Sequence, residues 1–209
     1  MNEQILRNLS YGVYVVSSYN DEKDAGCVAN SIIQVSYNTI AISINHNNYT
    51  NKCIQHSKKF GISILGENCD NNIIPVFGFQ SSKDVNKFEN FETIEKCGVK
   101  ILSNAIGYIC CELLDTLETE THTIFLGKIL DGDVLNQDEP MTYAYYHKVK
   151  KGTSPKNAPT YIEEKPTAST EIAYRCSICN YIYQGDIANE PDTYTCPICK
   201  QPKTVFVKI

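Results

Sequence analysis

Two closely spaced cysteine pairs near the C-terminus restrict the fold of this chain more than any other feature. Cys176 and Cys179 form the first pair, Cys196 and Cys199 form the second, and sixteen residues lie between the pairs. Four thiolates with this spacing can surround one metal ion tetrahedrally. Because a segment below about 40 residues seldom folds on a core alone, we expect this ion to organise residues 171–209. We call that segment the tail, Cys176–Cys179 the first knuckle and Cys196–Cys199 the second knuckle.

The remaining six cysteines have no metal-ligand spacing; they are Cys27, Cys53, Cys69, Cys97, Cys110 and Cys111. The N-terminus, MNEQILRNLSYG, lacks the layout of an export signal, so we expect a cytoplasmic protein with reduced thiols. The scattered cysteines are then interpreted as small buried hydrophobic side chains. Cys110 and Cys111 are adjacent in a predicted strand and point to opposite faces, so at most one is expected to face the core.

The net charge of the chain limits the classes of partner that it can bind. A formal net charge of −5 over 209 residues leaves no basic stripe to neutralise phosphates, so a general nucleic-acid binder is excluded. No apolar run is long enough to span a bilayer, and we expect no membrane partner.

The first 150 residues follow a strand pattern, and the tail follows a different one. Segments rich in β-branched and aromatic residues lie at 11–19, 31–37, 40–45, 60–65, 106–119 and 122–135. Two short helices are expected, one within 48–60, with Thr50 or Asn51 as its N-cap, and one before Pro75. The pattern predicts a mainly β protein, a closed barrel with a few short helices. We therefore divide the chain into a barrel (1–150), a proline-containing linker (151–170) and the tail (171–209).

The tail resembles a rubredoxin in its shortened, fused form. The resemblance rests on Tyr174 before the first knuckle, on Tyr181, Tyr183 and Gly185-Asp186 after it, on Cys196-Pro197-x-Cys199, and on Lys203-x-x-Phe206. It implies one redox-active iron shielded by Tyr174, Tyr183, Tyr194 and Phe206. The coordination chemistry alone leaves zinc open, because tetrahedral thiolate sites suit both metals. Rubredoxins usually carry glycine after each knuckle, where this chain has Asn180 and Lys200.

Residues 1–150 resemble the flavin reductase-like, FMN-binding split-barrel family. The resemblance rests on YGVYVVSS (11–18), Asn30-Ser31 with the strand after them, IAISINHNNYTNKCI (40–54), FGFQSSKDVNKF (77–88) and THTIFLG (121–127). Helix N-termini bind phosphate through free N–H groups, and a polar cluster sits where a helix is expected to begin. Candidate FMN-binding residues are Asn30, Ser31, Asn45, Asn48, Tyr49, Thr50, Lys52, Ser81, Ser82 and Lys83. His122, at the head of a strand, is the candidate catalytic residue beside the flavin.

The whole chain resembles the high-molecular-weight rubredoxins, in which a split-barrel flavodomain precedes a rubredoxin-like tail. The resemblance implies an FMN-dependent oxidoreductase that takes electrons from NAD(P)H, directly or through a reductase. Electrons would then pass through the iron to an acceptor such as a flavo-diiron protein, and the resemblance implies a homodimer. Two alternatives stay open: a carrier that is reduced only by a partner protein, and a flavin-binding module whose tail is a structural zinc ribbon.

Overall fold

The computed structural model describes residues 3–150, 152–155, 158–159, 172–179 and 181–209. Its strands are β1 (Tyr14–Tyr19), β2 (Asp24–Ala29), β3 (Ile32–Ser36), β4 (Thr39–Asn45), β5 (Lys59–Ile64), β6 (Thr93–Lys96), β7 (Val99–Leu102), β8 (Gly107–Glu118), β9 (His122–Val134), β10 (Ala173–Cys176), β11 (Ile182–Gln184) and β12 (Phe206–Lys208). Its α-helices are α1 (Tyr49–Ser57), α2 (Ile73–Phe79) and α3 (Tyr143–Lys148), and short 3-10 turns lie at Glu3–Asn8, Ile187–Asn189 and Lys203–Val205.

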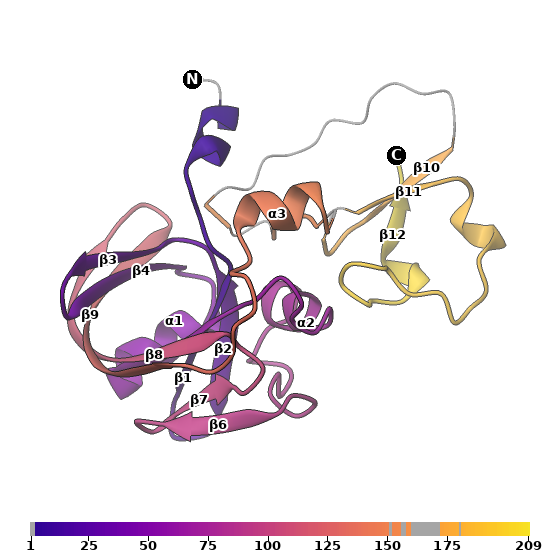
Figure 1. Cartoon of the computed structure of the whole chain (residues 1–209). Helices are drawn as coiled ribbons and strands as arrows, with labels where there is room; N and C mark the ends of the chain where they lie inside the picture. The colour runs from indigo at the N-terminus through magenta and orange to yellow at the C-terminus, as the bar shows by residue number, and fades with distance from the viewer. Residues whose placement is uncertain (1–2, 151, 156–157, 160–171, 180) are drawn as a thin grey trace.

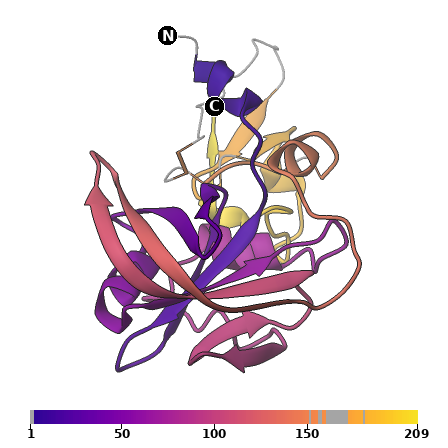
Figure 2. The ribbon, with the colours of Figure 1, turned by 60° about the vertical axis from the view of Figure 1, so that its left-hand side comes forward.

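Seven antiparallel strands form one curled sheet in the order β2-β1-β5-β8-β9-β4-β3 (Figure 1). The two edge strands are consecutive in the chain and are joined only by Asn30 and Ser31, so the sheet returns to itself at this corner. Val16, Ile42 and Phe125 fill the interior, while the long β8–β9 hairpin curves along one side (Figure 2). The predicted mainly β split barrel is confirmed.

The sequence reading missed β2, β6, β7 and α3. Strand β2 reads DAGCVA, and its aspartate, glycine and alanines have low strand propensity. It is a strand because β1 pairs with it along its whole length. The tertiary pairing therefore overrides the local preference.

The boundaries of the two predicted helices differ from the expectation. Asn48, not Thr50 or Asn51, is the N-cap of α1, and its side chain accepts a hydrogen bond from the Thr50 amide. Helix α2 contains Pro75 instead of ending before it. Proline is tolerated there because the N–H groups of a first helical turn have no acceptor within the helix.

Both Cys110 and Cys111 are buried, so the expectation that only one could face a core is wrong. They do point to opposite faces of β8, but each face is covered. Cys111 packs inside the barrel, whereas Cys110 packs outside it beneath Val99 and Ile101 of the β6–β7 hairpin. The scattered cysteines are buried as predicted except Cys97, which is exposed in the turn of that hairpin.

A buried lysine connects α2 to the barrel. Lys87 is 3% exposed, and its Nζ donates to the carbonyls of Gly26 and Phe77 at 2.8 and 3.1 Å. It forms no ion pair with the described residues. Burial lowers the pKa of Lys87 from 10.5 to about 8, because the charged form loses its hydration.

This lowered pKa predicts a pH-dependent stability difference between the native chain and Lys87→Met. Between pH 8 and 10.5 the unfolded chain binds a proton at Lys87 that the folded chain does not hold, so folding becomes more favourable as pH rises. The unfolding free energy of the native chain, minus that of Lys87→Met, is expected to increase by about 3 kcal/mol across this window. Denaturant titrations of both proteins measure the two unfolding free energies. The contribution of the buried thiols is the same in both proteins, so it cancels in the difference. A difference independent of pH would contradict the prediction.

The tail forms its own three-stranded sheet, in the order β11-β10-β12. It lies beside α2 and α3 at one side of the barrel (Figures 1 and 2), and Phe79 at the end of α2 packs against its cysteine cluster. The domain boundaries at residues 150 and 170 stay predictions, since most of the predicted linker lies outside the described residues. Among the described helices, none has the length and apolarity needed to cross a membrane.

Candidate functional site

A cavity of about 300 Å³ opens where the barrel meets the tail. One wall consists of the ends of β2 and β4, the start of α1 and the start of β9. The other consists of the end of α2, helix α3, residues 153–155, 158 and 159, and Ile178 of the tail. No charged side chain is among the described residues that line it. An anion in this cavity would therefore be bound by neutral donors.

Neutral donors gather at the N-terminus of α1. Asn47, Asn48 and Tyr49 line the cavity there. The amides of Asn47, Asn48, Thr50 and Asn51 already donate to Asn45 or Asn48, so the Tyr49 amide and the side-chain amides of Asn47 and Asn48 are the nearest donors for an anion. The Tyr49 hydroxyl is held by the Asn20 side chain at 2.8 Å. This end of the helix fits a phosphate group.

The structure brings six of the predicted flavin-site residues to the cavity: Asn30, Asn45, Asn48, Tyr49, Ser81 and His122. The other five lie outside its lining: Ser31, Thr50, Lys52, Ser82 and Lys83. Lys52 and Lys83 are exposed. The Ser82 hydroxyl is buried and bonds both to the amide and to the carbonyl of Gly26, which anchors its loop to the edge strand β2. The Ser82 hydroxyl therefore stabilises the fold of this loop.

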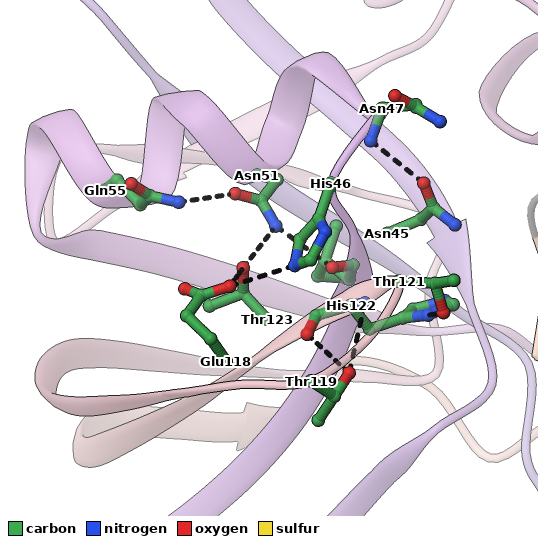
Figure 3. A network of polar contacts seen from close by, with 11 residues as sticks. Asn45, His46, Asn47, Asn51, Gln55, Glu118, Thr119, Thr121, His122 and Thr123 are labelled. Atoms are coloured by element: carbon green, nitrogen blue, oxygen red, sulfur yellow. Dashed lines mark hydrogen bonds and ion pairs between the residues drawn. The ribbon is translucent and has the colours of Figure 1, made fainter.

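His122 and Asn45 are held in place by a polar network that joins β4, α1 and the β8–β9 hairpin (Figure 3). His122 is 9% exposed; Thr121 Oγ1 lies 2.8 Å from its Nδ1, and Thr119 Oγ1 bonds to its backbone. Asn51 of α1 donates both to the Ile44 carbonyl and to Thr123 Oγ1, each at 3.0 Å. The imidazole is thus placed at the cavity wall by bonds from its own hairpin.

The network also includes residues that the sequence reading did not select. Thr123 Oγ1 donates to Glu118 at 3.0 Å, and the same carboxylate oxygen lies 2.9 Å from Nε2 of His46. A carboxylate and a histidine some 70 residues apart carry no sequence signal of proximity. Only the pairing of β9 with β4 and β8 brings them together.

The four tail cysteines meet as predicted. Their sulfurs all lie within 4.8 Å of one another, with 3.6 Å between Cys176 and Cys199 and 3.5 Å between Cys179 and Cys196. All four are fully buried and none forms a disulfide. Metal–sulfur bonds of about 2.3 Å in a tetrahedron separate the sulfurs by roughly 3.8 Å. The donor set and its spacing fit one iron or zinc ion.

Each knuckle directs backbone amides at its sulfurs in the same way. The amides of Cys179 and Tyr181 donate to Cys176 and Cys179, and those of Cys199 and Gln201 donate to Cys196 and Cys199. The two knuckles are thus related by an approximate two-fold repeat. Such N–H···S bonds tune the reduction potential of an iron–thiolate site.

Lys200 has the left-handed backbone that rubredoxins reach with glycine. Its φ is 58°, and its amide donates to the Cys196 carbonyl at 2.9 Å. Asn180, at the corresponding place after the first knuckle, lies outside the described residues. A side chain in this conformation costs about 1 kcal/mol relative to glycine.

Lys200→Gly is therefore expected to stabilise the tail by up to about 1 kcal/mol. The substitution removes the steric cost at Cβ and keeps the amide bond to Cys196. Thermal loss of the metal's visible absorbance is the measurement. A lower midpoint than that of the native chain would contradict the expectation.

An aromatic shell surrounds the cysteines. The four predicted residues, Tyr174, Tyr183, Tyr194 and Phe206, pack on them, together with Tyr181. The Tyr174 hydroxyl donates to Asp186 and the Tyr183 hydroxyl to Glu190, at 3.0 and 2.6 Å. Two acidic side chains that look like surface charge therefore hold the aromatic shell in place.

The first knuckle lies against the cavity. Ile178, between its two cysteines, lines the cavity wall. Thr153 Oγ1 donates to the Cys179 carbonyl at 3.1 Å, and the carbonyl of the same threonine accepts the Tyr146 hydroxyl at 3.4 Å. Burial raises the pKa of Tyr146, which lines the cavity on the other side of this segment. The metal centre and the cavity thus share a wall.

The sequence reading selected none of the barrel residues at that wall. Phe79, Tyr143, Tyr146 and Thr153 come from α2, from the missed helix α3 and from the predicted linker. The aromatic residues in YAYYHK were the available signal for a packed helix, because tyrosines three apart share a face. The contact itself had no signal.

Comparison with known proteins identifies two regions. Residues 6–154 match the model of the flavin reductase-like domain family, and residues 174–207 match the rubredoxin-like domain of rubrerythrin. The high-molecular-weight rubredoxin of Moorella thermoacetica is 38% identical over the full length of both chains. A ferric-chelate reductase (NAD(P)H) of Archaeoglobus fulgidus is 33% identical over 79% of this chain and 100% of that protein.

A solved structure confirms the fold of the barrel. An NADH:FAD oxidoreductase of Streptomyces globisporus superposes with a TM-score of 0.61 at 21% identity, covering 66% of this chain and 84% of that one. At this identity the likeness concerns the fold alone. The family matches and the four clustered cysteines indicate a flavin in the barrel and iron in the tail.

Proposed function

The chain belongs to the high-molecular-weight rubredoxin family, a flavin reductase-like domain followed by a rubredoxin-like domain, and on this premise we propose its specific reaction. It is an oxidoreductase that takes electrons from NAD(P)H onto FMN in the barrel cavity. It passes them to one iron held by Cys176, Cys179, Cys196 and Cys199. The observation that carries the proposal is the shared wall between the cavity and the first knuckle.

The residues of the cavity suit the parts of FMN. Asn47, Asn48 and the Tyr49 amide, at the start of α1, would bind the phosphate. Asn30 and Asn45 would reach the polar edge of the ring, and His122 would lie where the donor approaches. When bound, FMN accepts two electrons with a hydride and returns them singly, which matches the one-electron capacity of a single iron.

The electron acceptor, the oligomeric state and the cellular location are proposed from the family resemblance. A redox protein such as a flavo-diiron protein would accept the electrons, and the chain would act as a homodimer in the cytoplasm. The ferric-chelate reductase among its relatives supports NAD(P)H as the donor. The A. fulgidus protein matches 79% of this chain, so this support for the donor applies to the part of the chain that it matches.

Metal analysis and anaerobic spectroscopy test the proposal. Protein purified without oxygen is expected to contain one iron and one FMN per chain. Adding NADH or NADPH, with no other protein present, is expected to bleach the flavin band and then the ferric thiolate band. If neither nucleotide bleaches the flavin, the chain is a carrier that only a partner protein reduces. One zinc without iron would reject the relay and assign the tail as a structural ribbon.

A further inference from the structure

The two knuckles are nearly equivalent in sequence and in local structure. The first reads Cys-Ser-Ile-Cys and the second Cys-Pro-Ile-Cys, so Ile178 and Ile198 occupy the same place in each. Both knuckles direct amides at their sulfurs in the same pattern. Within the tail, Ile198 packs on the cysteine cluster and Ile178 is 39% exposed, so the shared amide pattern alone does not mark one side of the metal site as the entrance for electrons.

Contacts with the barrel distinguish the two knuckles. Ile178 lines the cavity, and the Cys179 carbonyl accepts the Thr153 hydroxyl at 3.1 Å. Ile198 is not in the cavity lining, and the hydrogen bonds of the second knuckle to described residues stay within the tail. Pro197 and Lys200 of that side are exposed, but so are Ser177 and Ile178 of the first knuckle, so the cavity lining and the Thr153 bond are what separate the two sides. One knuckle thus faces the cavity and the other faces away.

We propose that electrons enter the metal site through the first knuckle only, and that Ile178 and Thr153 are the positioning residues for this step. The inference rests on the proposed function, since it assumes a flavin in the cavity and iron in the tail. Each passage moves one electron from the reduced flavin to the ferric ion, which becomes ferrous. No bond of the protein forms or breaks. A second passage follows after the ferrous ion has given its electron to the external redox-protein acceptor, and the proton that arrived with the hydride is then released to solvent.

The physical basis is the short contact between the cavity and the ligand. Ile178 directly precedes Cys179 in the chain, so an electron that crosses the cavity wall at Ile178 is one residue away from a metal ligand. Thr153 fixes the carbonyl of that cysteine from the barrel side. Loosening either contact lengthens the gap between donor and acceptor, and electron transfer slows as that gap grows.

Ile178→Asn and Ile198→Asn form a matched pair of variants for the test. The flavin of the full-length holoprotein is reduced, and stopped-flow absorbance follows the flavin and iron bands separately. Ile178→Asn is expected to slow iron reduction severalfold while flavin reduction by NADH keeps its rate. Thr153→Val is expected to slow iron reduction by about fivefold, through loss of one hydrogen bond. Because Ile198 packs on the cysteine cluster, the iron content of each variant is measured first, and iron-loaded Ile198→Asn is expected to leave iron reduction unchanged.

Hydrogen exchange supplies a readout that does not depend on activity. The amides of 143–150, which lie behind the cavity wall, are expected to exchange faster in Ile178→Asn than in the native chain or in Ile198→Asn. Equal effects of the two isoleucine variants on iron reduction, or no effect of either, would overturn the proposal. If NADH fails to reduce the flavin, the donor assignment fails alone, and photoreduced flavin still tests the entry side. If the metal is zinc, entry through the knuckle is overturned together with the relay.

Discussion

Cys199→Ser is expected to empty the metal site and unfold the tail, with the largest effect of any single change considered. The tail has a small core of aromatic residues packed directly on the four sulfurs, and a segment of this size depends on its metal for folding. Serine is a poor ligand for a thiolate-selecting metal, and the three remaining cysteines leave one position open. Metal content and the visible absorbance of the site are both expected to fall nearly to zero.

The same variant separates the two halves of the protein. Flavin binding and reduction by NADH are expected to survive, because the barrel has its own core and the phosphate-binding helix lies within it. Electron delivery to any external acceptor through the iron is expected to stop. Cys97→Ser is the matched control, since Cys97 is exposed and lies outside the metal site. Retention of a full metal equivalent by Cys199→Ser would contradict the tetrathiolate assignment.

Asn48→Asp is expected to weaken FMN binding by about 100-fold or more while leaving the barrel as stable as before. The change replaces an amide group by a charged oxygen and keeps the size of the side chain. Aspartate caps helices as well as asparagine does, and its charge favours the helix N-terminus by up to about 0.5 kcal/mol. The same charge repels a phosphate placed at α1, in a cavity that offers no described charged side chain to compensate.

Fluorescence titration of deflavinated protein with FMN measures the affinity, and thermal unfolding of the same preparation measures stability. Asn48→Ser is the control, because serine caps the helix without a charge and is expected to bind FMN within about tenfold of the native chain. Wild-type affinity in Asn48→Asp would show that the phosphate binds elsewhere. Loss of affinity together with stability would mean that the cap, and not the charge, had failed.

Several site residues could be read from the sequence because their chemistry is local. Asn45, Asn48 and Tyr49 lie on the connection from a strand to a helix, so a correct reading of that connection places all three at one helix N-terminus. His122 begins a strand, as expected. Ser82 and Lys83 belong to a similar polar turn, yet the Ser82 hydroxyl bonds to β2 and Lys83 points to solvent. Polarity in a loop does not reveal which side of the loop faces the barrel.

The burial of the cysteines is a second property that the local sequence pattern does not determine. The alternation of a strand predicts correctly that Cys110 and Cys111 point apart. It cannot reveal that the β6–β7 hairpin covers the outer face, because that hairpin has only short strands and packs there by tertiary contact. Lys87 is a related case. Its sequence neighbours suggest a solvated turn, and only the carbonyls of Gly26 and Phe77 explain its burial.

By itself the sequence determined the tetrathiolate site and the mainly β barrel. The four ligands lie on two short turns of fixed spacing, and strand alternation is a local pattern, so neither depends on distant contacts. The tertiary structure alone decided that the first knuckle faces the cavity, because Ile178 and Thr153 meet through the packing of α2, α3 and the tail. Two knuckles with the same spacing are equivalent until the barrel packs against one of them.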